Sequence, residues 1–155
     1  MNLKFIKPTI KDIESIQKLI EKDVQSGILL ARSNDEIAKN IRSYIIVKNS
    51  ENDELIGNVA LQIHTAELGE IRSLFIKDSY RGKKIGKKLV EQINEEAKNL
   101  GLKQLLSLTY KKVFFEKLNF YEIPKTEISE HKIWEDCMKC KFYPNCDEVA
   151  MLKDI

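Results

Sequence analysis

The sequence predicts an α/β fold with a mixed sheet, on three observations. Short strand-like runs alternate along the chain with amphipathic helical runs. Glycine or asparagine follows most of the helical runs, where these residues commonly end helices. A chain of 155 residues, without internal repeats or a low-complexity linker, fits one hydrophobic core. We therefore expect residues 1–155 to form a single domain.

The first half of the chain contains a capped helix behind a short strand. Residues 3–7 are strand-like, and Thr9 with Asp12 forms the capping-box pattern of a helix start. The helix that follows ends near Gly27. Its apolar face comprises Ile10, Ile13, Ile16, Leu19, Ile20 and Val24. The remaining elements expected in this half are a weaker helix over 34–42 and strands over 44–47, 55–63 and 70–76.

The second half continues the alternation. A helix over 86–100 is closed by Gly101, and its apolar face comprises Leu89, Val90, Ile93, Ala97 and Leu100. A helix over 112–118 ends at Asn119, which can take the left-handed cap position that glycine usually fills. Strands are expected over 104–109, 120–123 and 148–153.

Composition argues against a nucleic-acid or membrane partner. The 26 Lys and Arg residues nearly balance 24 Asp and Glu, and a net charge of +2 is too small for non-specific binding to a polyanion. The N-terminus lacks the apolar run of a secretory signal, and no apolar run reaches the roughly 18 residues of a membrane span. We expect a cytoplasmic protein.

The stretch SYRGKKIGKK, residues 79–88, joins a strand-like run to a helix. Backbone N–H groups at the start of a helix lack intrahelical acceptors, and with the helix dipole they form a phosphate site. Lys83, Lys84, Lys87 and Lys88 add positive charge. Taken alone, the stretch is weak evidence for a phosphate site, and a solvated basic helix start is the more common alternative.

The wider context resembles the GNAT superfamily of N-acetyltransferases. The matching segments are GEIRSLFI, the loop itself, LLSLTY and VFFEKLNFY. The family's pyrophosphate loop reads Gln/Arg-x-x-Gly-x-Gly/Ala, which Arg81 and Gly86 match. Lys84 replaces the middle glycine, so we expect a backbone there that needs no glycine. The resemblance implies a mixed, mostly antiparallel central sheet flanked by helices, with the fourth and fifth strands splayed apart.

The resemblance also implies acetyl-CoA as cosubstrate. Amides near Leu74 and Ile76 would pair with its pantetheine arm, and the one near Leu74 would polarise the thioester carbonyl. Phe115 lies where the family often has a tyrosine that protonates the leaving thiolate, so Tyr110, or Tyr121, is the candidate acid. The predicted cofactor-binding residues are Leu74, Phe75, Ile76, Arg81, Gly82, Lys83, Lys84, Ile85, Gly86, Lys87 and Phe115.

Glu70, at the head of the fourth strand, is the predicted general base, acting through a water. The alternative from position alone is a solvent-exposed carboxylate at a strand end. His64 and His131 are rival bases. His64 lies in the polar HTAELG turn, where a surface histidine is the default expectation.

A second resemblance concerns the acceptor. GILLARSNDEIAKNI and the segments above are similar to the short glutamate N-acetyltransferases of arginine biosynthesis, in which the arginine of Leu-x-Arg-Ser, here Arg32, binds a substrate carboxylate. Arg72, Thr109 and Lys111, or Lys112, are further substrate-binding candidates, although each cation could equally be a surface residue. Other acceptors (a polyamine, a protein N-terminus, an antibiotic amine) and a non-catalytic acetyl-CoA- or metal-sensing module remain alternatives. The superfamily often forms homodimers.

Three cysteines, Cys137, Cys140 and Cys146, lie in a Cys-rich loop over 131–147. Their spacing supplies part of a structural zinc site, with His131, Asp147 or a water as the fourth ligand. The alternative is a set of reduced thiols that simply pack, because a second paired Cys-x-x-Cys is missing.

Overall fold

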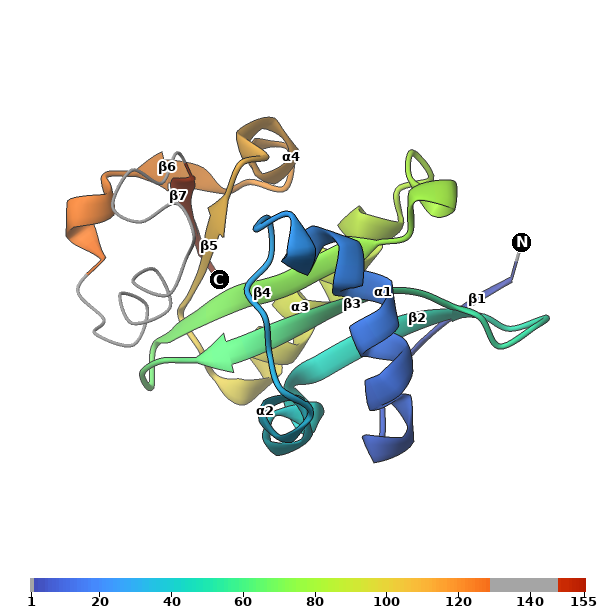
Figure 1. Ribbon diagram of the computed structural model, residues 1–155. Helices are drawn as coiled ribbons and strands as arrows, with labels where there is room; N and C mark the ends of the chain where they lie inside the picture. Colours follow the sequence, from blue (N-terminus) through green and yellow to red (C-terminus); the bar gives the residue numbers. More distant parts are fainter. Residues whose placement is uncertain (1, 129–147) are drawn as a thin grey trace. The chain divides into compact units, whose positions relative to one another are not determined.

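The computed structural model describes residues 2–128 and 148–155, and these adopt the predicted α/β fold (Figure 1). The described strands form one mixed sheet in the order β1-β2-β3-β4-β5-β7-β6. The strands are β1 (Leu3–Ile6), β2 (Tyr44–Asn49), β3 (Leu55–Ile63), β4 (Leu68–Ile76), β5 (Gln104–Thr109), β6 (Tyr121–Ile123) and β7 (Val149–Asp154). The α-helices are α1 (Ile13–Gln25), α2 (Asn34–Lys39), α3 (Ile85–Leu100) and α4 (Lys112–Glu116), and the 3₁₀ turns are η1 (Ile10–Asp12), η2 (Ile41–Ser43), η3 (Asp78–Tyr80) and η4 (Lys125–Glu127).

Most predicted elements are confirmed, and two helices are shorter than predicted. Gly27, Gly101 and Asn119 adopt the expected left-handed conformation after their helices. The helix predicted over 34–42 ends at Lys39. Both the backbone N–H and the side-chain amide of the next residue, Asn40, donate to the carbonyl of Glu36. The chain then continues as the 3₁₀ turn η2. Helix α4 ends at Glu116, two residues early.

The chain contacts divide the molecule into two compact units. The first unit comprises Met1–Leu61 and Arg72–Ile93, and the second comprises Gln62–Ile71 and Asn94–Ile155. Strands β3 and β4 and helix α3 each contribute residues to both units. None of the described helices is long and apolar enough to span a bilayer.

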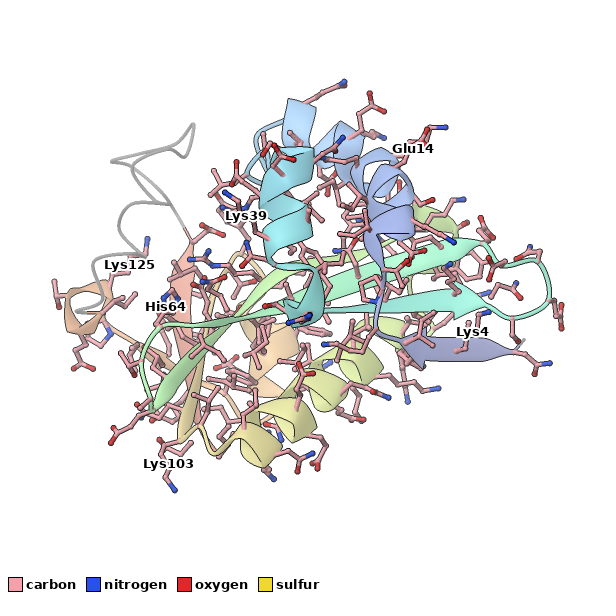
Figure 2. All side chains as sticks on the ribbon, turned by 90° about the horizontal axis from the view of Figure 1, so that it is seen from below. Lys4, Glu14, Lys39, His64, Lys103 and Lys125 are labelled. Atoms are coloured by element: carbon pink, nitrogen blue, oxygen red, sulfur yellow. The ribbon has the colours of Figure 1, made fainter. Side chains whose placement is uncertain are left out.

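The first unit has helices on both faces of its strands. Helices α1 and α2 cover one face of β2 and β3, and the beginning of α3 covers the other, as both views show (Figures 1 and 2). Strand β2 pairs antiparallel with β1 and with β3. The core beneath α1 and α2 comprises Ile13, Ile16, Ile37, Tyr44, Ile46 and Ala60. An ion pair of 3.0 Å between Asp12 and Lys48 ties the start of α1 to β2.

The second unit is built on β5. Strand β5 pairs antiparallel with β7 along its whole length, and β7 pairs in turn with β6. A small core forms among Leu106, Ile128 and Ala150. Strand β4 contributes only its first residues to the ladder with β5, in the parallel pairs from Leu68↔Gln104 to Glu70↔Leu106. In the described chain the ladder ends there, although β4 continues to Ile76 and β5 to Thr109. This confirms the predicted splay.

Helix α2 depends on a complete capping box, which the sequence analysis did not identify. The Ser33 hydroxyl accepts from the amide of Glu36, and the Glu36 carboxylate accepts from the amide of Ser33. Two N–H groups that the helix itself leaves unbonded are thereby satisfied. Because α2 has six residues, its few internal hydrogen bonds leave it dependent on this cap.

Replacing Ser33 by alanine is expected to lower the free energy of unfolding by about 1 kcal/mol, since an N-cap hydroxyl contributes about that much. Urea denaturation measures the loss. Ser33→Thr keeps the hydroxyl and Glu36→Gln keeps the acceptor of the box, so both should lose less. Equal losses in all three variants would contradict a capping role.

Candidate active site

The predicted anion loop lies in the first unit, between η3 and α3. Gly82 and Lys84 are both left-handed there, with φ of +79° and +62°. The amide of Lys88 bonds to the carbonyl of Lys84, so the helical hydrogen bonds begin at Lys84. The amides of Ile85, Gly86 and Lys87 follow as the first turn, whose N–H groups have no acceptor within the helix. The loop therefore has the strand-turn-helix form of an anion site.

One expectation for this loop is wrong. The lysine at the family's middle glycine position suggested a backbone that needs no glycine, whereas Lys84 takes a conformation that glycine adopts without strain. A left-handed residue with a side chain costs about 1–2 kcal/mol relative to a right-handed one. The loop therefore has a strained residue at the position where the family pattern has glycine.

The start of the loop is fastened on both sides. The Arg81 guanidinium bonds to the carbonyl of Ile76 and to the carboxylate of Asp78, both at 3.2 Å, and lies 5.7 Å from the ring centre of Phe75. Before it, Lys77 and Tyr80 both donate to Glu54, at the start of β3, and these two hydrogen bonds lower the pKa of that carboxyl. The segment before the loop is therefore held by hydrogen bonds to Glu54, next to β3, and to Ile76, at the end of β4.

Strand β4 contains an irregularity upstream of this loop. Ser73 has a φ of +56°, a left-handed conformation within a strand. The side-chain amide of Asn58, which is fully buried on β3, donates to the Ser73 carbonyl at 2.5 Å. The hydroxyl of Tyr44, on β2, is hydrogen-bonded to the Ser73 side chain. Side chains from two neighbouring strands therefore hold the irregular residue in place.

Two arginines predicted to bind substrate act on the same tyrosine. Arg32 lies in the loop before α2, and the side-chain amide of Gln17 donates to its carbonyl at 2.6 Å. The Arg32 side chain is 21% exposed, and its guanidinium lies 3.9 Å from the Glu36 carboxylate. Burial raises the pKa of Tyr44, whereas the Ser73 hydrogen bond and the charges of Arg32 and Arg72 oppose that rise. Tyr44 is thus a protonated phenol at neutral pH, in the field of two guanidinium groups.

Glu70, the predicted base, is in the second unit. It is 5% exposed, which excludes the solvated strand-end carboxylate considered from the sequence. The Glu70 carboxylate lies 2.8 Å from Nε2 of His64. His64, labelled in Figure 2, directly follows β3. The His64 side chain is fully buried, so the expectation of a surface histidine is wrong. The amide of His64 donates to the carbonyl of Leu68, which closes the turn between β3 and β4. The His64 ring is buried beside this hydrogen bond.

The other predicted residues are distributed over the second unit. Thr109 accepts from the amide of Lys111 at 2.9 Å. Tyr110 is 49% exposed, and Phe115 is buried against Phe114 and Phe120. Their proposed roles with substrate, thiolate and cofactor stay predictions.

Cys137, Cys140 and Cys146 lie outside the described residues, as does His131. Within residues 2–128 and 148–155, no group of three or more His, Cys, Asp or Glu side chains could hold a metal ion. The structural zinc predicted from the cysteines therefore stays a prediction.

Sequence reasoning missed Tyr44, Asn58 and the contact between His64 and Glu70. Tyr44 and Asn58 are ordinary strand residues in the sequence, and only strand pairing brings them to Ser73. His64 had one available signal, since it is six residues before Glu70 across a short polar turn. A hairpin places such positions close together.

Comparison with known proteins gives a consistent family. A family model described as an acetyltransferase (GNAT) domain matches residues 39–122. An uncharacterized N-acetyltransferase of Chlorobaculum tepidum is 34% identical over 94% of this chain and 92% of its own length. The amino-acid acetyltransferase of Photorhabdus laumondii is 36% identical over 72% of this chain, which spans only 25% of that protein.

A solved structure shares the fold. N-acetylglutamate synthase from Neisseria gonorrhoeae, complexed with coenzyme A and N-acetyl-glutamate, superposes with a TM-score of 0.86 at 22% identity. The match covers 99% of this chain and 35% of the synthase chain. At this identity the likeness concerns the fold.

The left-handed conformation of Lys84 can be tested through the stability of a glycine variant. Lys84→Gly should raise the free energy of unfolding by about 1 kcal/mol, because glycine removes the steric cost of that conformation. Lys83→Gly is the matched control: Lys83 is not left-handed, so glycine should lower stability there by about 0.5–1 kcal/mol. Urea denaturation of both variants checks the signs. A loss of stability in Lys84→Gly equal to that in Lys83→Gly would contradict the assigned conformation.

Proposed function

We propose, since the chain belongs to the GNAT family of acetyltransferases, that it transfers the acetyl group of acetyl-CoA to the α-amine of L-glutamate. The observation that carries the choice of acceptor is that the positive charges of Arg32 and Arg72 both act on the buried Tyr44, where they oppose the rise of its pKa. The family establishes an N-acetyltransferase, and this positive charge supports an anionic acceptor.

Acetyl-CoA fits the loop between η3 and α3. A pyrophosphate needs several N–H donors in a small space, and the first turn of α3 supplies them. The side chains of Lys83, Lys84 and Lys87 are exposed and can approach phosphates outside the backbone. The synthase with the same fold is a coenzyme A complex, which supports this assignment by analogy.

A carboxylate acceptor fits the group formed by Arg32, Arg72 and Tyr44, here called the arginine cluster, better than a cationic acceptor does. Two guanidinium groups and a phenol O–H are hydrogen-bond donors, and together they would stabilise an anion. A polyamine carries positive charge along its length, so the same field would oppose its binding. The cluster therefore favours an amino acid over a polyamine, and the amino-acid acetyltransferases among the relatives agree with this choice.

The chemistry requires one proton to leave the amine. The neutral amine nitrogen attacks the thioester carbonyl carbon, the C–S bond breaks, and CoA departs as a thiolate. Glu70, directly or through a water, accepts the proton that the nitrogen loses. The thiolate takes up one proton, for which Tyr110 is the proposed donor. The products are the N-acetyl amino acid and CoA.

A screen of free amino acids and polyamines, with release of CoA thiol as the readout, tests the proposed acceptor. We expect glutamate to give the highest kcat/KM. A chain that turned over polyamines and left glutamate untouched would remain a GNAT enzyme, but the glutamate proposal would be lost.

Replacing Glu70 by glutamine should lower kcat about 100- to 10,000-fold, the usual contribution of a general base, and leave the Kd of CoA unchanged. Steady-state kinetics and calorimetry measure the two effects. Glu67→Gln, an exposed glutamate of the same hairpin, is the matched control and should retain full activity. An active Glu70→Gln enzyme would remove Glu70 from the mechanism.

Replacing Arg32 by alanine should raise the KM for glutamate about 10- to 100-fold and leave that for acetyl-CoA unchanged, because a charge-assisted hydrogen bond contributes about 1.5–3 kcal/mol. Arg32→Lys should recover part of the loss through its charge. Arg42→Ala, at an exposed arginine on η2, is the control.

Glutamine as acceptor distinguishes the two carboxylates of glutamate. If Arg32 binds the side-chain carboxylate, the wild type prefers glutamate over glutamine and Arg32→Ala narrows that preference. If Arg32 binds the α-carboxylate, which both amino acids carry, Arg32→Ala should lower kcat/KM equally for glutamate and for glutamine. Unchanged glutamate kinetics in Arg32→Ala would exclude a role in acceptor binding.

A further inference from the structure

We propose that His64 is a positioning residue that fixes the orientation of the Glu70 carboxylate for proton transfer. The inference rests on the proposed role of Glu70 as base and adds a residue to that site. It stands on one contact, in which Nε2 of His64 lies 2.8 Å from Oε1 of Glu70. Both side chains are almost completely removed from solvent, with 0% of the His64 side chain and 7% of the Glu70 side chain exposed.

Both partners are attached to rigid backbone. The amide of His64 bonds to the carbonyl of Leu68 at 2.9 Å, which closes the hairpin between β3 and β4. Inside this turn the Thr65 hydroxyl accepts from the amides of Glu67 and Leu68. Glu70 itself is paired with Leu106 in the parallel ladder. A side chain held between two such supports has few alternative rotamers.

The two ring nitrogens of His64 differ in their surroundings. Nε2 faces the carboxylate, whereas Nδ1 is buried and has no hydrogen-bond partner among the described residues. A ring with its proton on Nε2 donates to Glu70 and leaves Nδ1 as an unprotonated acceptor. A doubly protonated ring would bury a second N–H for which residues 2–128 and 148–155 supply no acceptor, and a buried N–H without an acceptor is costly. The geometry thus favours a single neutral donor to Glu70.

A neutral donor suits a general base. The hydrogen bond orients the carboxylate without placing a full positive charge beside it, and a cation there would oppose uptake of a proton. Orientation matters because proton transfer needs a narrow range of distance and angle, and a misplacement of about 1 Å can cost 100-fold in rate. His64 would therefore act on kcat through Glu70, with no contact of its own to the substrate.

The matched pair His64→Gln and His64→Asn tests this role. Both variants introduce the same amide, but the longer glutamine side chain can place its N–H₂ near the Nε2 position, whereas asparagine reaches only the Nδ1 position. His64→Phe, which keeps the ring volume without a donor, is the third variant. Each is assayed with the amine that the wild type acetylates fastest, and its thermal stability is measured alongside.

We expect His64→Asn and His64→Phe to lose about 10- to 100-fold in kcat with little change in the KM for acetyl-CoA. His64→Gln should remain within about threefold of the wild type, because it restores the donor. Activity in His64→Asn equal to the wild type, or a His64→Gln enzyme as poor as His64→Asn, would overturn the proposal.

A double-mutant cycle separates positioning from general stability. In a Glu70→Gln background there is no base to orient, so adding His64→Asn should cost less than about threefold in kcat. The same loss in both backgrounds would mean that His64 only supports the fold, and would overturn the inference while leaving Glu70 as the base. A fully active Glu70→Gln enzyme would overturn both the His64 inference and the assignment of Glu70 as base. Failure of glutamate as the acceptor would affect neither of these two assignments.

Discussion

The left-handed residue in β4 is the constraint from which the candidate site follows. Side chains alternate along a regular strand, so one irregular residue changes the face that later residues occupy. Ser73 is that residue, and Asn58 and Tyr44 hold it from β3 and β2. Gly57 permits the close approach of β3, since a Cβ there would lie 2.6 Å from the carbonyl of Phe75. Strand β4 therefore carries Arg72 and the segment 74–76 in a shape that its own sequence would not adopt alone.

The strained backbone is maintained by burial. A left-handed serine costs about 1–2 kcal/mol, which an exposed strand would recover by relaxing. Asn58 is fully buried, and moving Ser73 would leave the Asn58 amide N–H groups without an acceptor, at a comparable or larger cost. Tyr44 adds a second hydrogen bond from the core beneath α1 and α2. The hydrogen bonds from Asn58 and Tyr44 to Ser73 therefore belong both to the packing of the core and to the geometry of β4.

The residues around Tyr44 and those around Glu70 differ in their charge. The positive charges of Arg32 and Arg72 both act on Tyr44, and the Glu36 carboxylate, 3.9 Å from the Arg32 guanidinium, offsets part of that charge. At Glu70 the acid is buried with an imidazole as its neighbour, and a carboxylate so removed from water needs such a hydrogen bond. Strand β4 contributes to both groups of residues, Arg72 to the first and Glu70 to the second.

The sequence by itself determined the alternation of strands and helices, the anion loop and the family, because these depend on local periodicity and on a contiguous motif. It also indicated Arg32 through the family resemblance, and Arg72 and Glu70 through their positions on the fourth strand. Only the tertiary structure decided that Lys84 and Ser73 are left-handed, that the charges of Arg32 and Arg72 act on Tyr44 and that the His64 ring contacts Glu70. Backbone conformation at a single residue, and contacts across strands, arise from packing between segments that are distant in the chain, and no local pattern in the sequence records them.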